Sequence, residues 1–151
     1  MNFEIIEQPL RFSLHGIHGI VEHERYAEVG LNLMNQMWHA IQRARLATTG
    51  INHWVYLPDH RMFVGVELRT PLSGSLPAPL EPCEFELPRY LKHVHVGPYQ
   101  ALPQKWKDLQ AQLAARGEVL GLPSLEVYGH HCADPAQTET TILIGLKAKP
   151  D

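Results

Sequence analysis

Two stretches of the chain carry apolar residues at helical spacing. In the first, about Tyr26–Leu46, polar side chains largely separate the apolar positions Leu31, Met34, Met37, Trp38 and Ile41. In the second, Leu102–Arg116, the apolar positions are Leu102, Trp106, Leu109 and Leu113. Residues three and four apart line one face of a helix, so both stretches are predicted to be amphipathic helices. Gly50 is expected to end the first helix or open the next loop, and Gly117 is expected to cap the second.

Shorter apolar segments around these helices have the length and residue types of β-strands. The expected strands are Arg11–Ile20, His53–Leu57, Met62–Leu68, Glu84–Gly97, Leu125–His130 and Thr140–Leu146. A kink or bulge is expected near Gly16, where the missing side chain lets another backbone approach, and Pro88 should interrupt the fourth strand. The turn residues Pro58-Asp59-His60 predict that the second and third strands form a hairpin.

A proline-rich segment divides the chain into two similar halves. Residues 70–83 are predicted to be a crossover linker, because proline is not tolerated inside helices or central strands. On either side, in repeats of about 1–69 and 84–149, the order strand–helix–strand–strand occurs twice. The expected fold class is α+β, with one pseudo-twofold domain over residues 1–151. Its antiparallel sheet would be buried against two helices that frame a central groove.

Length and charge narrow the class of protein. The 151 residues suffice for one domain, and a net charge of −3 argues against a dedicated nucleic-acid binder. Two cysteines, Cys83 and Cys132, cannot form a disulfide framework. The start of the chain is acidic, and no apolar run approaches the ~18 residues of a membrane span. We therefore expect a cytoplasmic protein without membrane association.

An ordered set of motifs in the second half points to a family. The set comprises Val96-Gly97-Pro98-Tyr99, Trp106-Lys107-Asp108-Leu109, Pro123-Ser124-Leu125-Glu126-Val127-Tyr128 and the apolar segment Thr141-Ile142-Leu143-Ile144. Together they resemble the GyrI-like family, which includes effector-binding domains of AraC- and MerR-type regulators. In the first half, Met37-Trp38 and Trp54-Val55-Tyr56 resemble the stand-alone DNA gyrase inhibitory proteins. Glu22-His23-Glu24 departs from the family, which often has a Gly-Pro-aromatic turn there.

The resemblance implies a SOUL-like duplicated fold whose groove recognises amphipathic, often cationic, drug-like molecules. A stand-alone multidrug-binding or drug-sequestering role is the leading interpretation. One alternative is a hydrolase of reactive, cyclopropanoid-type xenobiotics in the same groove. Another is a protein-interaction module whose partner is gyrase or a regulator. The chain leaves no room for a helix-turn-helix domain, so direct DNA binding is not expected.

The candidate site residues are one carboxylate and a set of aromatic side chains. Glu126 and Tyr128 are two apart on an expected strand, so both point to one face. Glu126 would pair with a ligand cation or, in a hydrolase, activate water, with Tyr128 as a hydrogen-bond donor. By the repeat, Trp54 and Tyr56 would form the opposite wall. Further candidate ligand contacts are Trp38, Tyr99 and Trp106. The alternative is a solvated glutamate beside aromatic residues of the core.

The histidines offer weaker candidates for chemistry. The groups are His15 with His18, His93 with His95, and His130-His131 beside Cys132. None has the spacing of a zinc site, so no metal is expected, and haem is an alternative without a sequence signature. No motif for a serine or cysteine nucleophile or for a nucleotide is present, so no cofactor is expected.

Overall fold

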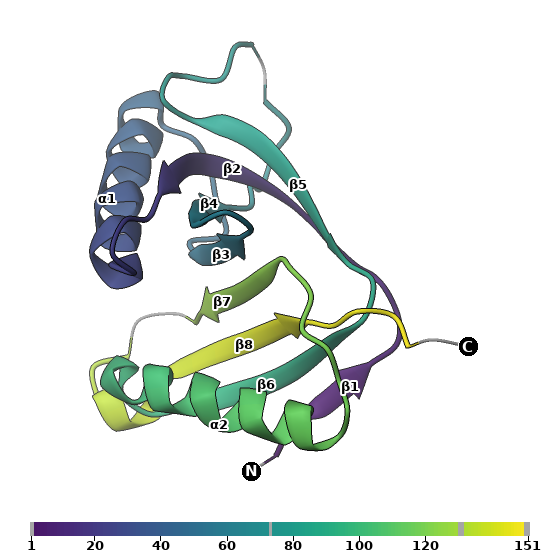
Figure 1. The fold of residues 1–151 in the computed structure, drawn as a ribbon. Coiled ribbons are helices and arrows are strands. Elements are labelled where there is room, and N and C mark those ends of the chain that lie inside the picture. Colours follow the sequence, from purple (N-terminus) through teal and green to yellow (C-terminus); the bar gives the residue numbers. More distant parts are fainter. Residues whose placement is uncertain (1, 73, 130–131, 150–151) are drawn as a thin grey trace.

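The computed structural model describes residues 2–72, 74–129 and 132–149. In these residues eight strands form one antiparallel sheet, accompanied by two α-helices (Figure 1). The strands are β1 (Glu4–Ile6), β2 (Leu10–Ile20), β3 (His53–Leu57), β4 (Arg61–Val66), β5 (Glu81–Leu87), β6 (Tyr90–Val96), β7 (Ser124–Tyr128) and β8 (Glu139–Gly145). The helices are α1 (Tyr26–Ala44) and α2 (Leu102–Ala115), with 3-10 turns at Tyr99–Ala101 and Pro135–Gln137. The expected α+β fold class is confirmed.

The two halves of the chain exchange their first strands. Each half runs strand–strand–helix–strand–strand, one strand more than the sequence pattern predicted. The sheet order is β1-β6-β8-β7-β3-β4-β2-β5, with β3 paired to β7 at its centre. At the edges, β1 of the first half pairs with β6, and β5 of the second half pairs with β2. Neither half can therefore complete its part of the sheet without the other.

Both helices lie on the same face of the sheet. Trp54 on β3 is directly opposite Glu126 on β7, and residues opposite each other in a sheet point to the same face. Trp54 packs in the apolar cluster beneath α1, and Glu126 accepts a hydrogen bond from Trp106 of α2. Figure 1 shows α1 beside the strands of the first half and α2 beside those of the second. The seam between β3 and β7 therefore runs where the two helical layers meet.

The face turned away from the helices is buried by the sheet itself. Its fully buried apolar residues include Leu14, Val55, Phe63, Leu87 and Leu125. The edge strands β1 and β5 continue through short connections into β2 and β6, which ties the two ends of the sheet together. The sheet consequently curls, as Figure 1 shows, and encloses this second core.

Several expected boundaries shift by a few residues. β5 begins at Glu81, so the end of the expected linker 70–83 belongs to a strand. This strand gains its backbone partners from β2, a long-range pairing that local composition does not reveal. α1 ends at Ala44, where Arg45 adopts a left-handed conformation with a φ of 53°, and Gly50 lies in the following loop.

Other boundaries agree with the expectations. Pro88 separates β5 from β6, and Gly117, with a φ of 76°, follows the end of α2. The β3–β4 hairpin is confirmed. The end of the expected strand Leu125–His130 lies outside the described residues. Within the described ranges, no helix is long and apolar enough to span a membrane.

Gly16 marks the point at which β2 changes partner. Residues Leu10–Gly16 pair with β5 and His15–Ile20 pair with β4, each in an unbroken register. The expected bulge is therefore wrong, because both ladders continue through the glycine. The expected close approach is confirmed: a Cβ on Gly16 would lie 1.9 Å from the carbonyl oxygen of Val64. Only a glycine allows the two backbones to meet at this distance.

We expect Gly16→Ala to lower the free energy of unfolding by about 2 kcal/mol, because overpacking of a rigid core typically costs ~1–3 kcal/mol. Urea denaturation followed by tryptophan fluorescence measures this loss. Ser13→Ala, at an exposed position of the same strand, is the matched control and should change the stability by less than about 0.5 kcal/mol. Equal stabilities of the two variants would contradict the close approach of β2 and β4.

Candidate functional site

Glu126 is a carboxylate buried at the centre of the sheet. It lies on β7 at the seam between the two halves, and only 5% of the residue is exposed. Its neighbours Leu125 and Val127 pack into the core on the opposite face. The alternation of a strand thus places Glu126 and Tyr128 on the helix-covered face, as the sequence predicted.

Three aromatic side chains donate hydrogen bonds to this carboxylate. The hydroxyl groups of Tyr56 and Tyr128 donate to Oε1 over 2.5 and 2.8 Å, and the indole Nε1 of Trp106 donates to Oε2 over 2.8 Å. The donors come from β3, β7 and α2, so both halves of the chain contribute to the site. Hydrogen bonds to an ionised group are stronger than neutral ones, and they offset part of the cost of burying the charge.

The donors are neutral, so the site retains a negative charge. Within the described residues, Glu126 takes part in no ion pair with a lysine, arginine or histidine. Burial, followed by the charge of Glu126, raises the pKa of both Tyr56 and Tyr128 far above the usual value of 10.0. Both phenols therefore stay protonated and remain donors at neutral pH. Among the described residues, the carboxylate therefore has hydrogen-bond donors beside it but no positively charged side chain.

Aromatic rings in edge-to-face contact surround the carboxylate. The ring of Tyr56 lies 5.8 Å from that of Trp106, and the ring of Tyr128 lies 5.3 Å from Trp54 and 5.5 Å from Tyr99. Tyr99, on the 3-10 turn before α2, is 50% exposed, whereas Trp54 is only 6% exposed. The rings thus run from the buried centre of the sheet to the molecular surface, and each ring face can contact an apolar or cationic group.

The structure brings six of the seven predicted site residues together and leaves Trp38 apart. Trp38 packs at the margin of the cluster beneath α1, and its Nε1 donates to Oδ1 of Asn52 over 2.7 Å. The backbone carbonyl of Asn52 accepts the N–H of Tyr128 over 3.0 Å. Trp38 therefore stabilises the end of β7 indirectly and makes no ring contact with the aromatic residues around Glu126 among the contacts described.

Sequence reasoning missed two residues that shape the site. Tyr26, the first residue of α1, packs edge-to-face on Tyr56 with 5.6 Å between ring centroids. Gly30 admits the indole of Trp54, because a Cβ there would lie only 2.2 Å from the ring. A glycine inside a helix is a sequence signal for close packing, and it could have pointed to Gly30. The position of Tyr26 depends on tertiary packing and has no such signal.

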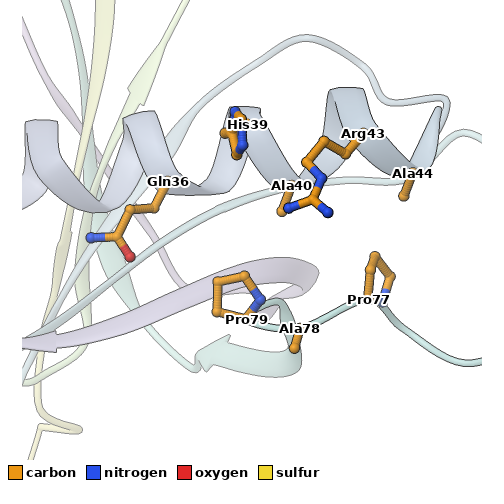
Figure 2. A pocket seen from close by; sticks show the side chains of 8 residues that line it. All are labelled: Gln36, His39, Ala40, Arg43, Ala44, Pro77, Ala78 and Pro79. Atoms are coloured by element: carbon orange, nitrogen blue, oxygen red, sulfur yellow. The ribbon is translucent and has the colours of Figure 1, made fainter.

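Two surface cavities of the described residues lie away from Glu126. One of about 370 Å³ lies between α1 and the proline segment, as Figure 2 shows. Gln36, His39, Arg43 and the segment Pro77–Pro79 contribute to its lining. The second, of about 430 Å³, adjoins His60 and the turn that follows β2. Around Glu126 the aromatic side chains contact the carboxylate and one another, and only 5% of Glu126 is exposed.

The predicted histidine groups do not converge. His93 contacts the backbone carbonyl of Asn2, and His95 contacts that of Pro98 over 3.3 Å. His18 contacts Glu81 on the other face of the sheet, and His130 and His131 lie outside the described residues. In the described parts of the chain, no three histidine, cysteine or acidic side chains are arranged to hold a metal ion.

Several solved structures share this fold. The EcmrR C-terminal domain matches with a TM-score of 0.69 and 14% identity, over 97% of this chain and 99% of that chain. The structure of SAV2435 bound to tetraphenylphosphonium matches with a TM-score of 0.65 and 18% identity, over 97% and 94%. A hydrolase from Listeria innocua matches with a TM-score of 0.53 and 12% identity, over 93% and 92%.

These likenesses concern the fold. No protein-family model matches the chain, and no curated protein matches it in sequence. The chain has the fold of GyrI-like domains, as the sequence resemblance predicted. With identities below one fifth, the chemistry of this chain has to be argued from its own residues.

The two raised tyrosine pKa values predict how stability depends on pH. Above pH 10.0 the unfolded chain loses phenolic protons that folded Tyr56 and Tyr128 keep. Stability is therefore full below this pH and falls above it, by about 1.4 kcal/mol per pH unit for each tyrosine. The phenolate absorbance of the five tyrosines should show two that ionise only when the protein unfolds.

The variants Tyr56→Phe and Tyr128→Phe identify the late-ionising groups. Each should remove one tyrosine from the late step and lessen the fall of stability with pH. Tyr99→Phe, at the exposed end of the aromatic set, is the control and should leave the late step unchanged. If all tyrosines ionise together in the folded protein, the buried cluster around Glu126 is not formed in solution.

Proposed function

We propose that this protein binds lipophilic organic cations that carry aromatic groups, with Glu126 as their counter-charge. The observation that carries the proposal is a carboxylate that is 5% exposed and hydrogen-bonded by three neutral donors. Hydrogen bonds reduce the cost of burying this charge, but they leave its sign uncompensated. A ligand cation that enters the aromatic set would supply the opposite charge.

The energies favour a charged aromatic ligand over a neutral one. Two opposite charges about 4 Å apart attract by roughly 4 kcal/mol when the effective dielectric constant is about 20. Each ring face next to the cation adds about 0.5–2 kcal/mol. Desolvation of a small hydrated ion would cancel much of this gain, whereas a cation shielded by phenyl groups loses little hydration. The preferred ligand is therefore large, apolar and positively charged.

Entry of such a ligand requires a movement of side chains. Tyr56 and Tyr128 stand on paired central strands, so their positions are fixed by the sheet. Trp106 stands on α2 and is half-buried, and Tyr99 is half-exposed on the turn before that helix. We infer that the ligand enters from the side of Tyr99 and α2 and replaces or rearranges the indole donor of Trp106.

The comparisons support this class of ligand. SAV2435, which shares the fold, was solved with tetraphenylphosphonium, a cation shielded by phenyl groups. The domain of EcmrR that matches is a separate C-terminal domain, and this chain covers 99% of it. A binding role for this fold is compatible with a chain of this size, because this chain covers 94% of SAV2435. The buried carboxylate beside aromatic donors in this chain supports the same ligand class here.

Hydrolysis of a reactive xenobiotic in the same place is the second candidate. A hydrolase from Listeria innocua shares the fold, and Glu126 beside two phenols could activate water. Both carboxylate oxygens, however, already accept hydrogen bonds from protein donors. Protein donors fill three of about four acceptor positions of the carboxylate, and Glu126 is only 5% exposed, so little room is left for an attacking water and binding is the better-supported function. A protein-partner role predicts that substitutions at Glu126 have no effect on activity.

Titration with tetraphenylphosphonium tests the proposal. We expect saturable binding by calorimetry and a weakening of about tenfold or more in Glu126→Gln, since each 1.4 kcal/mol lost is about a factor of ten. Glu139→Gln removes the same charge from an exposed position on β8. This matched control should bind within about twofold of the wild type, as expected for a screened surface charge.

A neutral ligand of similar shape separates charge from aromatic contact. Triphenylphosphine oxide should bind more weakly than tetraphenylphosphonium to the wild type, and Glu126→Gln should narrow the difference. Equal binding of the cation by wild type and Glu126→Gln would contradict the assignment of Glu126. Consumption of an excess of a cyclopropanoid substrate, lost in Glu126→Gln, would favour the hydrolase instead.

A further inference from the structure

A second cluster of reactive side chains lies on the face of the sheet opposite to Glu126. It consists of Cys83 and Glu81 on β5 and His18 on β2. In the register of the two strands, Leu14 is opposite Cys83 and Gly16 is opposite Glu81. Because alternate residues share a face, His18 follows on the same side as Cys83 and Glu81. Cys83 packs at the margin of the core that the curled sheet encloses.

The three side chains touch in a defined order. Nδ1 of His18 contacts Oε1 of Glu81, and the backbone N–H of His18 donates to the same oxygen over 3.2 Å. The other ring nitrogen, Nε2 of His18, lies 3.9 Å from Sγ of Cys83. A carboxylate at Nδ1 holds the proton on that nitrogen, so Nε2 presents its lone pair to the thiol. The order thiol, imidazole, carboxylate is that of an activated nucleophile with its base and an orienting acid.

The surroundings determine how the thiol could react. Burial and the charge of Glu81 raise the pKa of the Cys83 thiol, and the carboxylate of Glu84 acts in the same direction. The backbone N–H of Glu84 and the positive charge of Arg61, on β4, oppose this rise. The thiol is therefore protonated at rest, and a base has to take its proton during the reaction. His18 is the base in contact.

The cluster is accessible to small molecules. The side chains of His18 and Glu81 are 34% and 47% exposed, and Cys83 is half-buried. β5 is an edge strand, so one side of the cluster is open to solvent. On the inner side, the ring of Phe63 lies 4.7 Å from His18 and 5.4 Å from Phe85. An apolar wall beside a thiol suits an uncharged organic electrophile.

We propose that Cys83 is a nucleophile that adds to α,β-unsaturated carbonyl compounds, with His18 as its base and Glu81 as a positioning residue. Sγ forms a bond to the terminal alkene carbon, and the alkene electron pair moves to the carbonyl oxygen as an enolate. The thiol proton passes to Nε2 of His18 and then to the carbon next to the carbonyl. All atoms of both reactants remain in the thioether product, so no leaving group or co-reactant is required.

This covalent site is independent of the proposed cation site. The two lie on opposite faces of the sheet and share no residue. Glu126→Gln should therefore leave the reactivity of Cys83 unchanged, and substitutions at His18 should leave the binding of tetraphenylphosphonium unchanged. Each proposal can fail without the other.

The rate of alkylation by N-ethylmaleimide, followed by peptide mass spectrometry on the whole protein, tests the proposal. Cys132 is an internal control, because its Sγ contacts a backbone carbonyl of Gln137 instead of a base. We expect Cys83 to react faster than Cys132 at neutral pH. His18→Gln should slow Cys83 by about tenfold or more, since a positioned base typically contributes ~10²–10⁴.

The carboxylates provide a matched pair of variants. Glu81→Gln should slow Cys83 several-fold and shift the pH dependence of its rate, because the imidazole loses its orienting partner. Glu86→Gln removes an equal charge from an exposed position of the same strand, where the carboxylate pairs with Arg11 over 3.2 Å and makes no contact with His18 among those described. Its rate should stay within about twofold of the wild type, as for other exposed charges.

The dependence of the Cys83 reaction rate on pH shows whether His18 acts as a base or only packs beside the thiol. With His18 as base, the rate at Cys83 should depend less steeply on pH than in His18→Gln, in which it should rise about tenfold per pH unit with the thiolate. A rate at Cys83 no greater than at Cys132, or an equal or faster rate in His18→Gln, would overturn the proposal. Should His18→Gln not fold, the Glu81→Gln rate and the wild-type profile decide the question.

Discussion

The architecture of this protein depends on keeping one carboxylate, Glu126, buried at the centre of a sheet. An ionised group in such a place costs several kcal/mol unless its oxygens are hydrogen-bonded. Tyr56, Tyr128 and Trp106 supply those bonds from two central strands and one helix. Three neutral donors satisfy the oxygens without removing the charge. The structure therefore holds an uncompensated anion in apolar surroundings, which is the property on which the proposed recognition of cations rests.

The exchange of strands explains how one chain can hold such a site rigidly. β3 and β7 form the seam beneath Glu126, and the outer strands β1 and β5 each pair with the other half. The close approach at Gly16 fixes β2 against β4 within the sheet, and Gly30 lets α1 pack directly on the indole of Trp54 on β3. Strand pairing and helix packing therefore both hold the seam in place. Among the aromatic residues around Glu126, the side chains of Tyr99, which is exposed, and Trp106, which stands on α2, are the ones that can move to admit a ligand.

Local patterns predicted much of this arrangement, and long-range pairing accounts for most of what they missed. Helical spacing identified both helices, and strand alternation placed Glu126 and Tyr128 on one face. The duplication of the chain correctly brought Tyr56 to the same carboxylate. By contrast, β1 is only three residues long and gains its backbone partners from β6, so the local pattern did not predict it. Cys83 lies in β5, which was not predicted to begin before Glu84 because prolines surround its first residues. Cys83 and His18 are 65 positions apart in the sequence, so no local motif could have predicted their contact.

The indole N–H resonances of the three tryptophans provide the most direct measurement of the central claim. In the free protein, the Trp106 signal, assigned with Trp106→Phe, should lie downfield because it donates to a charged oxygen, and Glu126→Gln should move it upfield. Saturation with tetraphenylphosphonium should perturb this signal and leave that of Trp38, bonded to Asn52, nearly unchanged. A Trp106 signal that is insensitive both to Glu126→Gln and to the cation would contradict a buried anionic site at Glu126.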